Sequence, residues 1–142
     1  MNTPNKTIYD VLNKGSIKGY TDLPQSLKLS KILRPETADM TWVCNSVGAP
    51  YVSTIPIKGY QNQEQICPCW SLAALLKQIP ISYKDEGEYC YALINTNPKA
   101  DPYAWCSCYE NDKGRMIFEC YEENPVDACV DMIHKLKKEN LL

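Results

Sequence analysis

Apolar residues recur at helical spacing near the end of the chain. The stripe consists of Val126, Cys129, Val130, Ile133 and Leu136. Asn124 can cap a helix N-terminus, and Pro125 suits a first turn because its missing N–H needs no acceptor there. Lys135, Lys137 and Lys138 fit the last turn, where the helix dipole favours cations. The pattern predicts a C-terminal helix with one buried face.

Two further helices are expected upstream. The clearer one has apolar residues at i, i+3, i+4 and i+7: Leu72, Leu75, Leu76 and Ile79. Its expected start is Pro68 and its expected end is Pro80. The other begins after Asp22 and runs for about ten residues to Arg34-Pro35, where proline stops it. Pro35 then opens a short helical turn.

Elsewhere the hydrophobic pattern changes to the alternation of strands. Two short strands are expected between residues 41 and 60, followed by a polar loop over 58–65. Three runs rich in Tyr, Ile, Trp and Phe then cover residues 88–95, 103–110 and 115–122. Turn-forming residues separate them, which predicts an antiparallel meander.

Together these elements predict an α+β fold, with a small antiparallel sheet of three or more strands packed against helices in a single domain over residues 21–142. Residues 1–20 are expected to form a flexible N-terminal arm. The chain has 142 residues. At this size a domain buries roughly two thirds of the surface of its unfolded chain, so a core needs no metal or disulfide.

The N-terminus has no apolar run typical of a signal peptide, and nothing in the sequence resembles a transmembrane span. We therefore expect a cytoplasmic protein without membrane contact. In that compartment the eight cysteines are expected to be reduced thiols.

Charge is unevenly distributed along the chain. The formal net charge is −2, but residues 1–34 carry +4 and the remainder −6. Lys28, Lys31 and Arg34 are the candidate contacts of this basic segment with an acidic partner, either RNA or a protein surface. The alternative is that these residues form an ordinary solvated helix face.

Candidate chemistry is sparse. Cys67-Pro68-Cys69 and Cys106-Ser107-Cys108 have one intervening residue, whereas structural zinc sites usually have two to four. Asp127, Asp131 and His134 share a helical face, but any solvated helix presents such a face. No phosphate-binding glycine motif occurs. We assign no catalytic residue, no metal site and no cofactor.

Tyrosine is the unusual residue type, with ten copies beside three Trp and one Phe. The ring of tyrosine buries apolar area while its hydroxyl can stay in contact with water, so tyrosine is common at recognition surfaces. In the middle strand of the meander, alternation places Tyr103, Trp105 and Tyr109 on one face, away from Cys106 and Cys108. That face is either a binding surface or the face that packs under a helix.

Three segments resemble, as a set, a family of small uncharacterised proteins encoded by phages and prophages of gut and related bacteria. They are LRPETADMTW (33–42), CPCWSLAALLKQIP (67–80) and NPVDACVDMIHKLKKENLL (124–142). The resemblance spans about residues 23–142 and implies a phage context without a particular chemistry. The residues that carry it would be caps and core positions: Glu36, Thr37, Ala38, Asp39, Pro68, Trp70, Ser71, Leu72, Leu75, Asn124, Pro125, Asp127 and Ala128.

From this context we expect a non-enzymatic protein that binds a host protein or ribonucleoprotein complex and inhibits an antiviral defence complex, for example an RNA-guided effector. One alternative is a metal- or thiol-dependent hydrolase of a nucleotide signal, which would need His134 together with Asp127 and Asp131. Another is a virion or assembly accessory protein.

Overall fold

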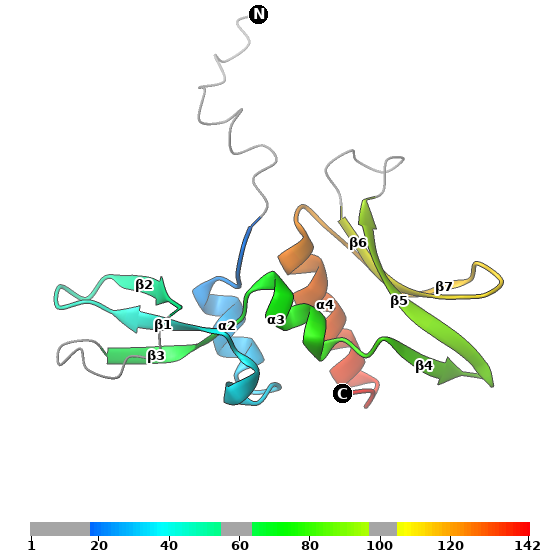
Figure 1. Ribbon diagram of the computed structural model, residues 1–142, viewed down its shortest axis with the longest axis horizontal. Coiled ribbons are helices and arrows are strands. Elements are labelled where there is room, and N and C mark those ends of the chain that lie inside the picture. Colours follow the sequence, from blue (N-terminus) through cyan, green and yellow to red (C-terminus); the bar gives the residue numbers. More distant parts are fainter. Residues whose placement is uncertain (1–17, 55–63, 97–104) are drawn as a thin grey trace, which may run out of the picture.

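Two antiparallel sheets flank a central group of helices in the computed structural model, which describes residues 18–54, 64–96 and 105–142 (Figure 1). The elements are α2 (Leu23–Leu29), the short 3-10 helix η1 (Pro35–Thr37), β1 (Met40–Cys44), β2 (Pro50–Ser53), β3 (Glu64–Cys69), α3 (Leu72–Gln78), β4 (Ser82–Asp85), β5 (Glu88–Thr96), β6 (Trp105–Asn111), β7 (Met116–Glu122) and α4 (Pro125–Lys138). The α+β fold class is confirmed, although the strands form two sheets rather than one.

The first sheet has three strands in the order β2-β1-β3. Strand β3 corrects two predictions, because its residues were expected to be a loop up to residue 65 and a helix from Pro68. Pro68 pairs with Thr41 at the edge of the sheet, where a strand tolerates the missing N–H. Helix α3 begins only after Ser71, whose Oγ accepts a hydrogen bond from the Ala74 N–H at 3.1 Å.

The second sheet has four strands in the order β4-β5-β6-β7. Strands β5, β6 and β7 confirm the predicted meander. The edge strand β4 was not predicted, because its four residues alternate between exposed and half-buried without an apolar run. The ladder between β6 and β7 shifts register between Ser107 and Tyr109.

One core cluster joins the three α-helices to the four-stranded sheet. It includes Leu29 of α2, Trp70 before α3, Leu75 of α3 and Tyr109 of β6, all with no exposed surface. Helix α4 packs against β6, β7 and α3. The predicted stripe of α4 is buried along its whole length, with Asn124 as the N-cap.

Helix α2 is shorter than the predicted ten residues. It ends at Leu29, and the Ser30 hydroxyl donates to the Ser26 carbonyl at 2.7 Å. Ser and Thr side chains compete in this way for backbone acceptors and weaken a helix end. The following turn still brings Leu33 into the core before Arg34 and Pro35.

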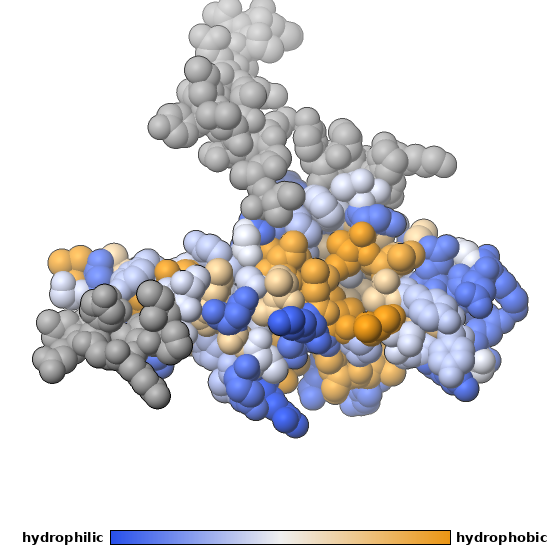
Figure 2. Space-filling view, in the orientation of Figure 1, coloured by the Kyte–Doolittle hydropathy of each residue, from blue (hydrophilic) through white to orange (hydrophobic). Residues whose placement is uncertain are grey.

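Figure 2 shows an apolar area in the middle of this view, over α3 and toward the four-stranded sheet. Leu76 of α3 and Ile81, which precedes β4, are among the exposed large apolar side chains. Apolar area alone does not specify the chemistry of a partner, so we assign it no ligand. No helix within the described residues is both long enough and apolar enough to cross a membrane.

Candidate interaction surfaces

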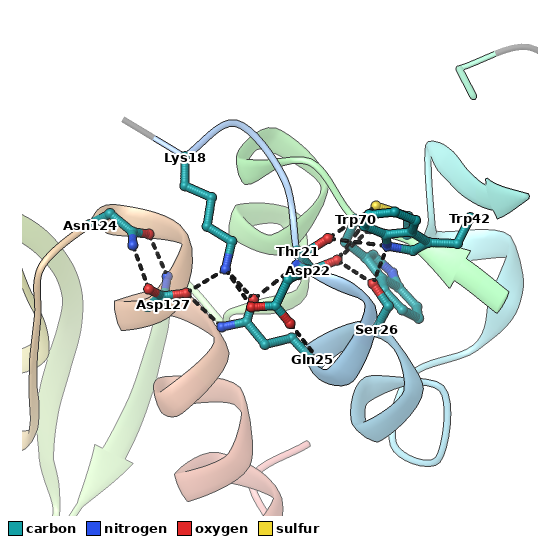
Figure 3. A network of polar contacts seen from close by, with 10 residues as sticks. Lys18, Thr21, Asp22, Gln25, Ser26, Trp42, Trp70, Asn124 and Asp127 are labelled. Atoms are coloured by element: carbon teal, nitrogen blue, oxygen red, sulfur yellow. Dashed lines mark hydrogen bonds and ion pairs between the residues drawn. The ribbon is translucent and has the colours of Figure 1, made fainter. Parts of the chain in front are cut away.

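A polar cluster fastens the first described residues to the start of α4 (Figure 3). The Lys18 ammonium donates to Asp22 at 2.9 Å, to Gln25 Oε1 at 2.7 Å and to Asp127 at 2.9 Å. Gln25 Nε2 donates to the same Asp127 oxygen at 2.6 Å, and Asn124 also contacts this carboxylate. We call this cluster, Lys18, Asp22, Gln25, Asn124 and Asp127, the clasp.

Hydrogen bonds stabilise the charged forms of Asp127 and Lys18 in the clasp. Burial by itself would raise the pKa of Asp127, but hydrogen bonds from Gln25, Lys18 and Asn124 outweigh it and lower that pKa. Burial would lower the pKa of Lys18, and its hydrogen bonds to Asp22 and Asp127 reverse this effect and raise it. Both groups are therefore charged near neutral pH, and they hold α2 against α4.

Residues 18–20, which were expected to belong to the flexible arm, contact the domain. The Gly19 carbonyl accepts a hydrogen bond from the Leu72 N–H at 3.1 Å, and Tyr20 forms a β-bridge with Ser71. The rest of the predicted arm, residues 1–17, lies outside the described residues.

The three predicted cations lie on one short stretch at the end of α2. Lys28, Lys31 and Arg34 are all exposed. None of them forms an ion pair with another residue in the part of the chain that the structure describes. Residues 23–35 contain no carboxylate and the exposed Glu36 follows them, so this stretch presents an excess of positive charge. We call Lys28, Lys31 and Arg34 the basic stretch.

The predicted aromatic trio is not brought together as one exposed surface. Tyr109 is fully buried, and its hydroxyl donates to the Pro80 carbonyl at 2.6 Å. Burial, followed by the nearby Tyr83, raises the pKa of Tyr109 to about 12. Trp105 is half-buried, and Tyr103 lies outside the described residues. For Tyr109, packing in the core is the alternative that the structure supports.

An exposed tyrosine surface does exist, on the opposite face of the same sheet. Side chains alternate along β5, so Ala92 and Ile94 pack on the core while Tyr89, Tyr91 and Leu93 point away from it. Pairing extends this outer face across the sheet, because Tyr91 pairs with Glu110 and Glu110 with Met116. We call the exposed members the tyrosine face: Tyr89, Tyr91, Leu93, Met116 and Tyr121, each between 38% and 52% exposed.

No family model, curated protein or solved structure matches this chain. The resemblance to phage-encoded proteins therefore stays a prediction.

The cysteines are all unpaired thiols, and all but Cys44 are buried. Cys106 and Cys108 lie on the outer side of β6, where Tyr121 and Leu93 are their neighbours in the ladder. Burial raises the pKa of Cys108 to about 12, with the nearby Cys106 as the next cause. A thiol with such a pKa stays protonated and is a poor nucleophile at neutral pH.

The structure does not bring Asp127, Asp131 and His134 together as one site. Asp127 belongs to the clasp, while a hydrogen bond with Asp131, followed by burial, raises the pKa of Glu122 to about 7. Within residues 18–54, 64–96 and 105–142, no group of three His, Cys, Asp or Glu side chains is placed to hold a metal ion. The carboxylate pair between β7 and α4 was missed by sequence reasoning, because it depends on how two elements pack.

Proposed function

We propose that this chain is a non-enzymatic binding protein of phage origin that works in the host cytoplasm and contacts an acidic partner through the basic stretch. The observation that carries the proposal is the exposure of Lys28, Lys31 and Arg34, without ion pairs to other described residues and without a carboxylate between residues 23 and 35. Three neighbouring free cations attract phosphates or acidic side chains over about 8–10 Å at physiological salt.

The partner we propose is a host antiviral defence complex, and the effect of binding is its inhibition. A ribonucleoprotein effector offers both RNA phosphates and acidic protein surface, which are the two acidic surfaces that the basic stretch fits. The resemblance of three segments to phage-encoded proteins supports this choice of partner.

Charge reversal tests the proposal in cells. Bacteria with an active RNA-guided defence would express the wild-type chain, the triple variant Lys28→Glu, Lys31→Glu, Arg34→Glu, or a control with Lys77→Glu, Lys137→Glu and Lys138→Glu. Both variants change the net charge equally, but the control changes exposed lysines on α3 and α4. We expect phage to plate efficiently with the wild type and the control, and poorly with the basic-stretch variant.

Binding to the purified effector gives the physical measurement. Each phosphate contact adds roughly 0.7–0.9 to the slope of log affinity against log salt, so the triple variant should lose affinity most at low salt and show a shallower slope. If wild type and triple variant inhibit and bind alike at both salt concentrations, the basic stretch is not the contact surface. If no defence system is inhibited, the virion or assembly role gains support instead.

A further inference from the structure

The tyrosine face already holds one cation of the chain itself. Lys84 lies opposite Tyr89 in the ladder between β4 and β5, and its Nζ is 4.9 Å from the centroid of the Tyr89 ring. An aromatic ring attracts a cation above its face because the centre of the ring carries partial negative charge. The outer side of this sheet is therefore a place where a cation and a tyrosine ring pack together.

The charge around the tyrosine face is negative. Residues 82–122 have a formal charge of −4. The two other described cations of this segment are engaged at the ends of the hairpins, Lys113 with Glu88 and Arg115 with Glu86. The tyrosine face therefore lies in a segment whose carboxylates outnumber its cations, and Lys135 of α4 reaches this segment from outside by donating to the Glu119 carbonyl.

One of these carboxylates lies within the tyrosine face. Glu110 is flanked in the ladder by Tyr91 on β5 and by Met116 on β7. It is half-buried, and no described residue forms an ion pair with it. At the other side of the face, the Tyr121 hydroxyl donates to the Glu119 carboxylate at 2.7 Å. Glu110 is thus the ladder partner of Tyr91, and the Glu119 carboxylate contacts the Tyr121 hydroxyl.

We propose that the tyrosine face binds an arginine-bearing segment of a partner protein, with guanidinium groups stacked on Tyr91 and Tyr121 and paired with Glu110 and Glu119. Arginine fits this chemistry better than lysine, because a planar guanidinium stacks on a ring and donates two parallel hydrogen bonds to a carboxylate. Phosphate fits it worst, because the surrounding carboxylates repel an anion.

This surface is additional to the basic stretch and has the opposite charge requirement. It does not depend on the proposed inhibition of a defence complex, since the peptide experiment below uses only the purified chain. A partner that presents both acidic and arginine-rich surfaces would engage both ends of the molecule.

A short arginine peptide is a direct probe. Tyr91 on β5 and Tyr121 on β7 are separated by β6, so the probe needs several arginines on a flexible chain to reach both rings. A peptide of four Gly-Arg repeats with blocked ends would be titrated into the full-length chain labelled with 15N. Matched peptides carry lysine or the uncharged analogue citrulline in place of arginine, and an oligouridylate represents single-stranded RNA.

We expect the arginine peptide to shift the amide signals of β5, β6 and β7 and to bind more tightly than the lysine peptide, with little binding by citrulline. Glu110→Gln removes one charge at almost constant shape and should weaken binding severalfold. Tyr91→Ser and Tyr121→Ser should each weaken it by about two- to fivefold, the usual contribution of one exposed cation–ring contact. The basic-stretch triple variant should bind the arginine peptide as well as or better than wild type.

Three results would overturn this assignment. The first is a set of shifted signals that centres on the hairpin ends near Glu86 and Asp112. The second is an unchanged affinity in Glu110→Gln and in both tyrosine variants, with each variant still folded by circular dichroism. The third is tighter binding of oligouridylate than of the arginine peptide at the tyrosine face, which would identify a nucleic-acid surface instead.

Discussion

The two halves of this molecule each contain an antiparallel sheet, and their exposed surfaces have opposite chemistry. Both sheets are antiparallel, but the first contacts α2 through β3 and the second contacts α4 through β6 and β7. Next to the first sheet, α2 and the turn after it present three cations without ion pairs to described residues, while the outer side of the four-stranded sheet presents tyrosines and carboxylates. The core cluster includes residues of the helices and of the four-stranded sheet, whereas the buried residues of the first sheet, Val43, Cys67 and Cys69, lie outside it. The exposed side chains thus distinguish the two halves, whereas the core cluster ties the helices to the four-stranded sheet.

The largest effect is expected in the shared core. Leu75→Ala removes a fully buried side chain of α3, which should cost about 2–5 kcal/mol through lost burial and a cavity. Val130→Asn places an amide in the buried face of α4 and should cost about 1–3 kcal/mol for the unpaired polar group alone. Urea unfolding measures both.

A matched control for this prediction is Leu76→Ala, because Leu76 neighbours Leu75 in α3 but is 44% exposed. It should change the unfolding free energy by less than about 1 kcal/mol. Since α2, α3, α4 and the four-stranded sheet contribute to one core cluster, each variant should still unfold in one transition. Two separate transitions would show that the halves are energetically independent.

The clasp should give the next largest effect. Asp127→Ala leaves the Lys18 ammonium without its partner on α4 and should cost about 1.5–3 kcal/mol, the usual contribution of hydrogen bonds to charged groups. Lys18→Met tests the same contact from the other side and keeps most of the apolar stem. If both single variants and the double variant lose equal stability, the two side chains act as one unit.

Acid should weaken the clasp. The pKa of Asp127 is lower in the folded chain than its ordinary value of 3.8. Its contribution to stability is therefore complete above that value and is lost as the pH falls below it. In Asp127→Asn, the loss of stability between about pH 4 and pH 2 should be smaller than in wild type. An equal loss would assign the acid sensitivity to other carboxyl groups.

Glu122 is expected to make a smaller contribution to stability, with the opposite pH dependence to that of Asp127. Its pKa rises from 4.5 to about 7 on folding, so the folded state binds this proton more tightly. The resulting stability is present below 4.5 and is lost as the pH rises through 7. Glu122→Gln should flatten this part of the pH profile, by less than about 1 kcal/mol because the pair lies near solvent. Melting curves across this range measure it.

The smallest effect is expected for His134→Ala. This side chain is half-buried on α4, and Asp127 is held by the clasp rather than by His134. Stability should change by no more than about 0.5 kcal/mol, and the proposed inhibition of a defence complex should be unaffected. Complete loss of biological activity in a variant with an unchanged melting temperature would favour the hydrolase alternative.

Sequence reasoning predicted the helices and strands that carry strong local signals. Asn124-Pro125 and the apolar stripe after it specify α4 by spacing alone, and the turns around β5, β6 and β7 separate those strands. Prediction from the sequence failed where the local signals disagree with the packing of the elements. Pro68 is typical of a helix start, but the edge of the first sheet accommodates it, and Ser71 begins the helix instead.

Of the two candidate surfaces, the basic stretch could be predicted from the sequence and the tyrosine face could not. Charged side chains stay exposed in almost any fold, so the exposure of Lys28, Lys31 and Arg34 followed from residue type. The tyrosine face could not be located in this way, because both faces of β5 carry apolar side chains. Tyr89, Tyr91 and Leu93 alternate with Cys90, Ala92 and Ile94, and only the position of α4 decides which set is covered.

The clasp also has a consequence for how the protein is made. Lys18 and Asp127 are 109 residues apart, so a ribosome synthesises α2 long before its partner on α4. At roughly 5–20 residues per second, about 5–20 seconds separate the two. During this interval the nascent chain exposes Trp70 and Leu75, which α4 later helps to bury. A message truncated before codon 124 would therefore yield a product that cannot close its core, and cellular proteases should remove it.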